Sequence, residues 1–121
     1  LEINIKQGME YGQARKILID SGWQAVNANR TPNGAPVCFL VATMQSFSFQ
    51  DDVACKYNEI DACSGTGMGY CKMIFHDGDG GFLSVITSGG RPPDAVIDNW
   101  SKEASFEANV IPLDEINNYE N

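Results

Sequence analysis

Four cysteines within 121 residues constrain the fold of this chain more than any other feature. They are Cys38, Cys55, Cys63 and Cys71, and four cysteines can pair in three ways. Three glycines lie between Cys63 and Cys71, and glycine lets the backbone turn tightly at little steric cost. Such a turn brings two Cβ atoms to the roughly 4 Å that a disulfide needs. We therefore favour a Cys63–Cys71 bond, with Cys38 and Cys55 left to pair with each other, and the other two pairings stay open.

Metal-binding and redox roles fit these cysteines poorly. No two of them have the close spacing of a zinc site, His76 is the only histidine, and a Cys-x-x-Cys motif is absent. Disulfides persist mainly in secreted and periplasmic proteins, so we predict one of those locations. Because the metal and redox motifs are missing, we also expect no cofactor. Because the sequence begins with Leu1 rather than methionine, we expect a mature chain whose signal peptide has been removed, and the alternative is a sequence trimmed at its start.

The length of the chain predicts a single domain over residues 1–121, because this is near the commonest domain size. A chain of this length buries about two-thirds of its unfolded surface and needs no metal or partner to fold. The longest apolar run covers residues 37–43, far short of the about 20 residues that cross a bilayer. We therefore expect no transmembrane segment.

The charge of the chain is strongly negative and unevenly distributed. The net charge is −8, and residues 94–121 carry seven acidic residues and one lysine, a net charge of −6. This balance argues against nucleic acid and anionic membranes as partners, since both repel it, and favours a basic protein. Acidic residues alternate with two aromatic residues there, as on the binding face of an inhibitor of a basic enzyme. The predicted partner-binding residues are Asp94, Asp98, Trp100, Glu103, Phe106 and Glu107. The alternative is a solvated acidic face with both aromatic residues in the core.

The clearest local pattern predicts an amphipathic helix from Met9 to Gly22. Ala14, Ile17, Leu18 and Ser21 recur at helical spacing on one face, and Gly22 stands where a helix commonly ends. A short strand is expected over residues 23–26, and residues 27–36 are rich in Asn, Pro and Gly and predict an exposed loop.

A hairpin is the next clear signal. Residues 72–76 and 81–87 are strand-like, and the Asp-Gly-Asp-Gly sequence between them has strong turn chemistry. The weaker expectations are a strand over 37–42, a second helix from about Ser48 to Tyr57, a strand over 95–100 and an edge strand over 110–113. Together the elements predict an α+β fold, with helices packed on one face of a small antiparallel sheet and two disulfides.

Two short motifs carry a partial resemblance to known families. Gly8-Met9 opening a helix, followed by Gly22-Trp23, resembles small periplasmic bacterial domains of the β-lactamase-inhibitor-protein and BamE-like type. The sequence from Cys63 to Cys71 is similar to small secreted bacterial proteins of unassigned activity. The resemblance covers Gly8 to Gly90, and it implies a non-enzymatic domain that binds another protein.

Candidate catalytic and cation sites each have a simpler explanation. His76 with Asp77 and Asp79 could perform acid–base chemistry, but a histidine at a strand end more commonly faces solvent. The same aspartates resemble part of a calcium loop, yet no glutamate follows between Phe82 and Asn99 to complete it. No nucleophile motif or phosphate-binding loop is present.

The sequence therefore predicts a secreted or periplasmic, non-enzymatic protein-binding domain. An inhibitor or immunity protein that acts against a basic toxin or hydrolase is the sharpest form of this hypothesis. The alternatives are an envelope-associated structural domain and a small hydrolase that uses His76.

Overall fold

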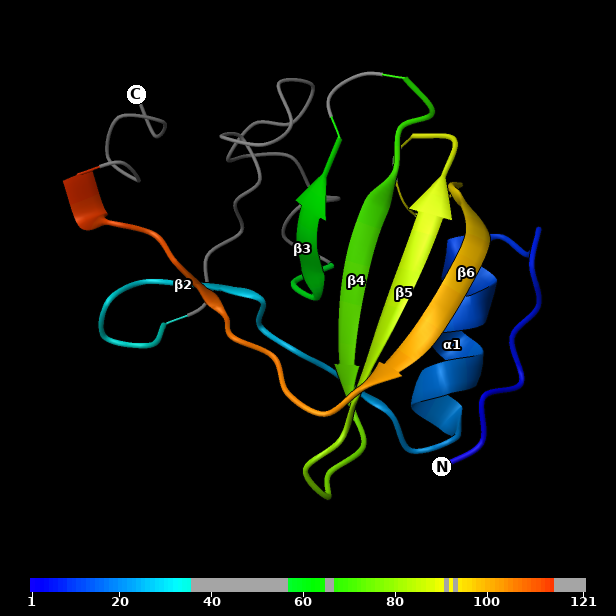
Figure 1. The fold of residues 1–121 in the computed structure, drawn as a ribbon, viewed down its shortest axis with the longest axis horizontal. Helices are drawn as coiled ribbons and strands as arrows, with labels where there is room; N and C mark the ends of the chain where they lie inside the picture. Colours follow the sequence, from blue (N-terminus) through cyan, green and yellow to red (C-terminus); the bar gives the residue numbers. More distant parts are fainter. Residues whose placement is uncertain (36–56, 65–66, 91, 93, 115–121) are drawn as a thin grey trace.

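The computed structural model describes residues 1–35, 57–64, 67–90, 92 and 94–114 (Figure 1). In these parts of the chain, one helix packs against one face of an antiparallel sheet (Figure 1). The helix is α1 (Tyr11–Asp20), and the sheet contains β1 (Gln24–Ala25), β3 (Ile60–Cys63), β4 (Cys71–His76), β5 (Phe82–Ser88) and β6 (Val96–Glu103). A separate parallel ribbon consists of β2 (Asn29–Arg30) and β7 (Asn109–Val110). The predicted α+β class is confirmed.

The sheet is built around β4, which has neighbours on both edges. One edge of β4 pairs with β5. The other edge pairs with two strands, with β1 near His76 and with β3 near Cys71. β6 pairs with β5 and forms one border of the sheet (Figure 1). Each of these pairings is antiparallel.

Helix α1 confirms the predicted amphipathic segment. Ala14 and Leu18 are buried on the predicted face, Ile17 and Ser21 are half-buried, and Tyr11, which was not predicted there, is also buried against the sheet. Gly22 adopts a φ of +106°, and the backbone N–H of Trp23 donates to the carbonyl of Leu18 at 3.0 Å. This is the left-handed glycine ending that the position of Gly22 predicts.

The β4–β5 hairpin confirms the second clear prediction. His76 lies opposite Phe82, and the turn between them is the Asp-Gly-Asp-Gly-Gly segment. Met73 lies opposite Val85, and both side chains are buried on the helix side of the sheet. The predicted strand over 95–100 is also present, and β6 extends three residues further than expected.

The polar ribbon of β2 and β7 corrects the prediction of an exposed loop over 27–36. Ala28 and Asn29 are buried, and Asn29 donates its side-chain N–H to the carbonyl of Ile60 at 2.8 Å. Asn109 donates in turn to the side-chain oxygen of Asn29 at 3.1 Å. Of the edge strand expected over 110–113, only Val110 lies in a strand, which is β7 and pairs with β2 rather than with the main sheet.

Several sequence predictions lie outside the described residues. The pairing of Cys38 with Cys55, the strand over 37–42 and the helix from about Ser48 to Tyr57, except for Tyr57 itself, belong to this group. Of the two predicted disulfides, the Cys63–Cys71 bond is present and is the one found in the described part of the chain.

Candidate protein-interaction surface

The disulfide closes a loop between β3 and β4. Cys63 and Cys71 lie directly opposite each other in the strand register, with their Cα atoms 4.0 Å apart. The backbone N–H of Ser64 donates to the carbonyl of Tyr70 at 2.7 Å, one step beyond the disulfide. We call Ser64 and residues 67–70, the described part of this connection, the clamped loop, because a covalent bond and a backbone hydrogen bond fix its base.

A second chain segment supports the clamped loop. The N–H of Gly89 donates to the carbonyl of Met68 at 2.8 Å. Gly69 has a φ of +65°, and a Cβ atom at this position would lie 2.8 Å from the nitrogen of Gly90. Only glycine allows the two backbones to approach so closely. The connection between β5 and β6 therefore holds the loop at one end of the sheet (Figure 1).

The clamped loop exposes two large side chains to solvent. Met68 is 62% exposed and Tyr70 is 42% exposed, whereas Cys71 beside them is buried. Methionine and tyrosine are both enriched at protein interfaces, where they supply apolar contact area. A fixed loop also loses little conformational entropy on binding. The loop thus has the chemistry and the rigidity of a recognition element.

The predicted partner-binding residues lie on β6 and on the segments before and after it, and they do not form one patch. Asp94 is exposed in the connection that supports the clamped loop, and Asp98 is half-buried within β6. Glu103 is exposed where β6 ends, at the opposite end of the sheet, and the exposed Glu107 follows it. Only Asp94 therefore lies at the same end of the sheet as the clamped loop.

The two aromatic residues of that prediction make contacts within the chain. Trp100 is half-buried and packs against the hydrophobic core, opposite Val85. Phe106 is also half-buried, with its ring centroid 6.1 Å from that of Phe82. Only the exposed part of each aromatic side chain is therefore available to a binding partner.

His76 is held by its own hairpin. Its Nδ1 atom accepts a hydrogen bond from the backbone N–H of Gly78 at 3.1 Å, and its ring lies 4.8 Å from that of Phe82. The Oδ1 atom of Asp77 accepts backbone hydrogen bonds from Asp79 at 2.7 Å and Gly81 at 3.0 Å. His76 and Asp77 thus both bind the turn, and no ion pair joins His76 to a carboxylate among the described residues.

The turn contacts of Asp77 predict a depressed pKa for its carboxyl group. Hydrogen bonds from the backbone of Asp79 and then of Gly81 favour the ionised form and lower this pKa below its usual value of 3.8. The carboxylate therefore stabilises the hairpin at neutral pH, and this stabilisation is lost as the pH falls below 3.8 through the depressed pKa. An NMR titration of the wild type should give a midpoint below 3.8 for Asp77.

The matched variant for this prediction is Asp77→Asn, which keeps an oxygen acceptor but cannot ionise. Its melting temperature should change less with pH in the acid range than that of the wild type. A titration midpoint for Asp77 at or above 3.8 would contradict the assigned role of the turn hydrogen bonds.

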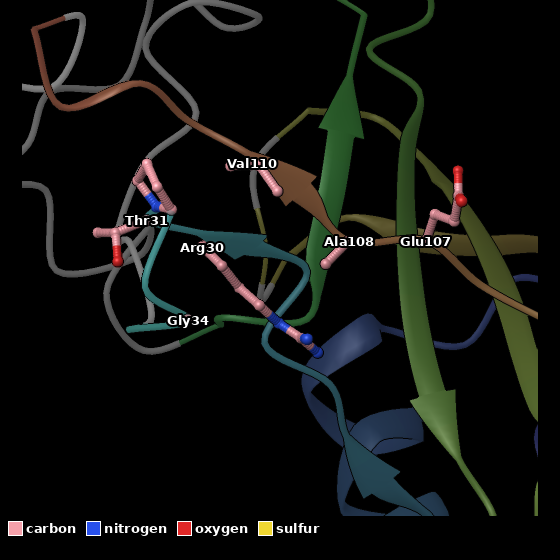
Figure 2. A pocket seen from close by; sticks show the side chains of 7 residues that line it. Arg30, Thr31, Gly34, Glu107, Ala108 and Val110 are labelled. Carbon is pink, nitrogen blue, oxygen red and sulfur yellow. The ribbon is translucent and has the colours of Figure 1, made fainter.

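A pocket of about 470 Å³ lies beside the β2–β7 ribbon (Figure 2). Arg30, Thr31, Gly34, Glu107 and Val110 are among its lining residues. The Arg30 side chain points away from Thr31 and Gly34, and its charged end lies apart from that of Glu107 (Figure 2). The Nε atom of Arg30 donates to the carbonyl of Asn27 at 2.8 Å. The two opposite charges are therefore not paired across the pocket.

A buried carboxylate lies against α1, one residue before the start of β3. Glu59 is fully buried, and its Oε2 atom accepts hydrogen bonds from the Tyr11 hydroxyl at 2.5 Å and from Arg15 Nε at 2.6 Å. Burial, and then the negative charge of Glu59, raise the pKa of Tyr11 well above 10.0. The guanidinium of Arg15 lies 5.1 Å from the ring centroid of Tyr57. Sequence reasoning missed this cluster, which ties α1 to the start of β3.

Metal-ligating groups do not gather anywhere in the part of the chain that the structure describes. The single described helix is also too short and too polar to cross a bilayer. No family model matches the chain, and no curated protein or solved structure is significantly similar to it. The resemblance to periplasmic inhibitor and BamE-like domains accordingly stays a prediction.

Proposed function

We propose that this chain is a secreted or periplasmic, non-enzymatic domain that binds another protein through its clamped loop. The observation that carries the proposal is the exposure of Met68 and Tyr70 on a loop fixed by a disulfide and by the backbone of residues 89–90. A backbone held in one conformation favours binding, because the loop then loses little further entropy when its exposed side chains contact a partner.

The partner should be a basic protein. Asp94 lies in the segment that supports the clamped loop, and residues 94–121 carry a net charge of −6. The excess of negative charge on the chain raises the rate of encounter with a partner of the opposite sign. The disulfide supports the proposed location, since such bonds persist in oxidising compartments.

Loss of both exposed side chains should abolish capture of the partner. The wild type and a Met68→Ser, Tyr70→Ser double variant would each be immobilised and exposed to the extracellular and periplasmic proteins of the native source. We expect a protein retained by the wild type to bind the double variant at least about tenfold more weakly, because two apolar contacts are removed.

The matched control removes exposed apolar side chains elsewhere. Val110→Ser and Leu113→Ser alter residues that are 60% and 59% exposed, close to the exposure of Met68. Binding should be unchanged in this control. Equal binding by the wild type and the clamped-loop variant would contradict the proposal.

A further inference from the structure

The outer edge of β6 is covered at only one end within the described residues. The N–H of Gly8 donates to the carbonyl of Ile97 at 2.8 Å, and the N–H of Ile97 donates to the carbonyl of Met9 at 2.8 Å. No described backbone group bonds to the outer edge of the strand between Asp98 and Glu103. Figure 1 shows β6 at the border of the sheet. An open strand edge of this kind can pair with a further strand.

The register shows which backbone groups this open edge presents. Ile97, Trp100 and Lys102 lie opposite Thr87, Val85 and Leu83, so all three occupy the helix side of the sheet. A bulge at Asp98 accounts for the three-residue step from Ile97 to Trp100. Residues on the same side of a strand direct their N–H and C=O groups to the same edge. Because Ile97 bonds outward, Trp100 and Lys102 also direct their backbone groups outward.

We propose that this edge pairs with the same edge of a second copy of the chain. The strands would run antiparallel about a two-fold axis at Ser101. Trp100 then lies opposite Lys102 of the partner copy, and Asn99 lies opposite Glu103 of the partner copy. The proposal is independent of the clamped loop, which lies at one end of the sheet.

The side chains of the open edge suit this self-pairing. In this register no two side chains of like charge lie directly opposite each other. Such a pair would destabilise the association of the two strands. Lys102 is exposed and can lie over the indole of Trp100 in the partner copy, an attraction between a cation and an aromatic ring. Each of these residue pairs forms twice, because a two-fold interface repeats every contact by symmetry.

The length of the open edge also suits a second copy. In this register the covered residue Ile97 would lie opposite Ser105 of the partner copy, which is beyond the end of β6. The segment formed by Gly8 and Met9 therefore does not meet the partner strand.

The net charge of −8 on each copy determines how the association of two copies depends on salt concentration. Two acidic copies repel each other, and added salt shortens the range of this repulsion from about 30 Å at 0.01 M to about 3 Å at 1 M. Association of two copies should therefore strengthen with salt. Binding of a basic partner would weaken under the same change.

Sedimentation equilibrium on the full chain over a range of concentrations tests the proposal. The weight-average mass should rise above the 13.2 kDa of one chain toward twice that value. Asn99→Lys places a cation opposite Glu103 of the partner copy, and Asn99→Glu places a like charge there. Because two such pairs form, the dimer should tighten about fivefold with lysine and weaken about fivefold with glutamate.

The control places the same charges away from the edge. Gln13 is exposed on α1, so Gln13→Lys and Gln13→Glu change the net charge equally but add no cross-strand pair. A mass of one chain at every concentration and salt would overturn the proposal. Equal effects of the Asn99 and Gln13 variants would overturn it as well.

A cross-link tests the register itself. Ser101→Cys places two thiols opposite each other on the symmetry axis, at the Cα separation of about 4.5 Å found in close antiparallel pairs. Diamide as the oxidant should give a dimer of twice the chain mass, and Ser105→Cys should give little. Equal cross-linking of the two variants would contradict the register.

Discussion

Glu59→Ala is expected to lower the free energy of unfolding by about 3–5 kcal/mol, the usual cost of removing one partner from a buried ion pair. The carboxylate is fully buried and accepts hydrogen bonds from Tyr11 and Arg15. Without it, the Tyr11 hydroxyl loses its partner inside the core, and the half-buried guanidinium of Arg15 loses its counter-charge. Urea denaturation followed by circular dichroism would measure the change.

An exposed ion pair on the same helix provides the control. Lys16 and Asp20 are 2.8 Å apart, but both side chains are largely exposed to water. Asp20→Ala should therefore leave the denaturation midpoint nearly unchanged. Equal losses in the Glu59 and Asp20 variants would show that the buried carboxylate does not anchor α1 to β3.

Removal of the disulfide by Cys63→Ala and Cys71→Ala is expected to lower the free energy of unfolding by about 2.5 kcal/mol, from the loop entropy for a separation of eight residues. Most of this cost comes from the greater freedom of the unfolded chain. The double replacement avoids a free thiol at either position. Denaturation of the variant and the wild type without reductant would measure the difference.

The same variant should also weaken partner binding, because the clamped loop would lose the covalent bond at its base. The bond from Gly89 to Met68 would remain, so the loss should be smaller than for the Met68→Ser, Tyr70→Ser variant. That second variant should keep the stability of the wild type, since both side chains are exposed. Full partner binding without the disulfide would contradict the role of loop rigidity.

Sequence patterns predicted the parts of the fold that depend on neighbouring residues. The helix ending at Gly22, the β4–β5 hairpin and the Cys63–Cys71 bond each follow from local spacing and turn chemistry. The short strand β3 was missed, because its four residues include Asp61 and show no clear alternation.

Contacts between distant residues account for the other differences. Glu59 lies 48 residues from Tyr11 and 44 from Arg15, and no local pattern marks them as partners. Asn29 looked like part of a polar loop because its hydrogen bonds to Ile60 and Asn109 are distant in sequence. The acidic composition of residues 94–121 was evident, but their spacing did not show that Asp94 and Glu103 lie at opposite ends of the sheet.

The β2–β7 ribbon has a consequence for the order of folding. Asn29 and Asn109 are 80 residues apart, and their side chains and strands meet only when both segments are present. During synthesis, β2 must therefore wait until the chain has been made through Val110. Contacts of such long range slow folding, because a large loop must close before the pairing stabilises it. The hairpin and α1 can form earlier, and the ribbon would then pair the segment that follows β1 with the segment that follows β6 as a late step.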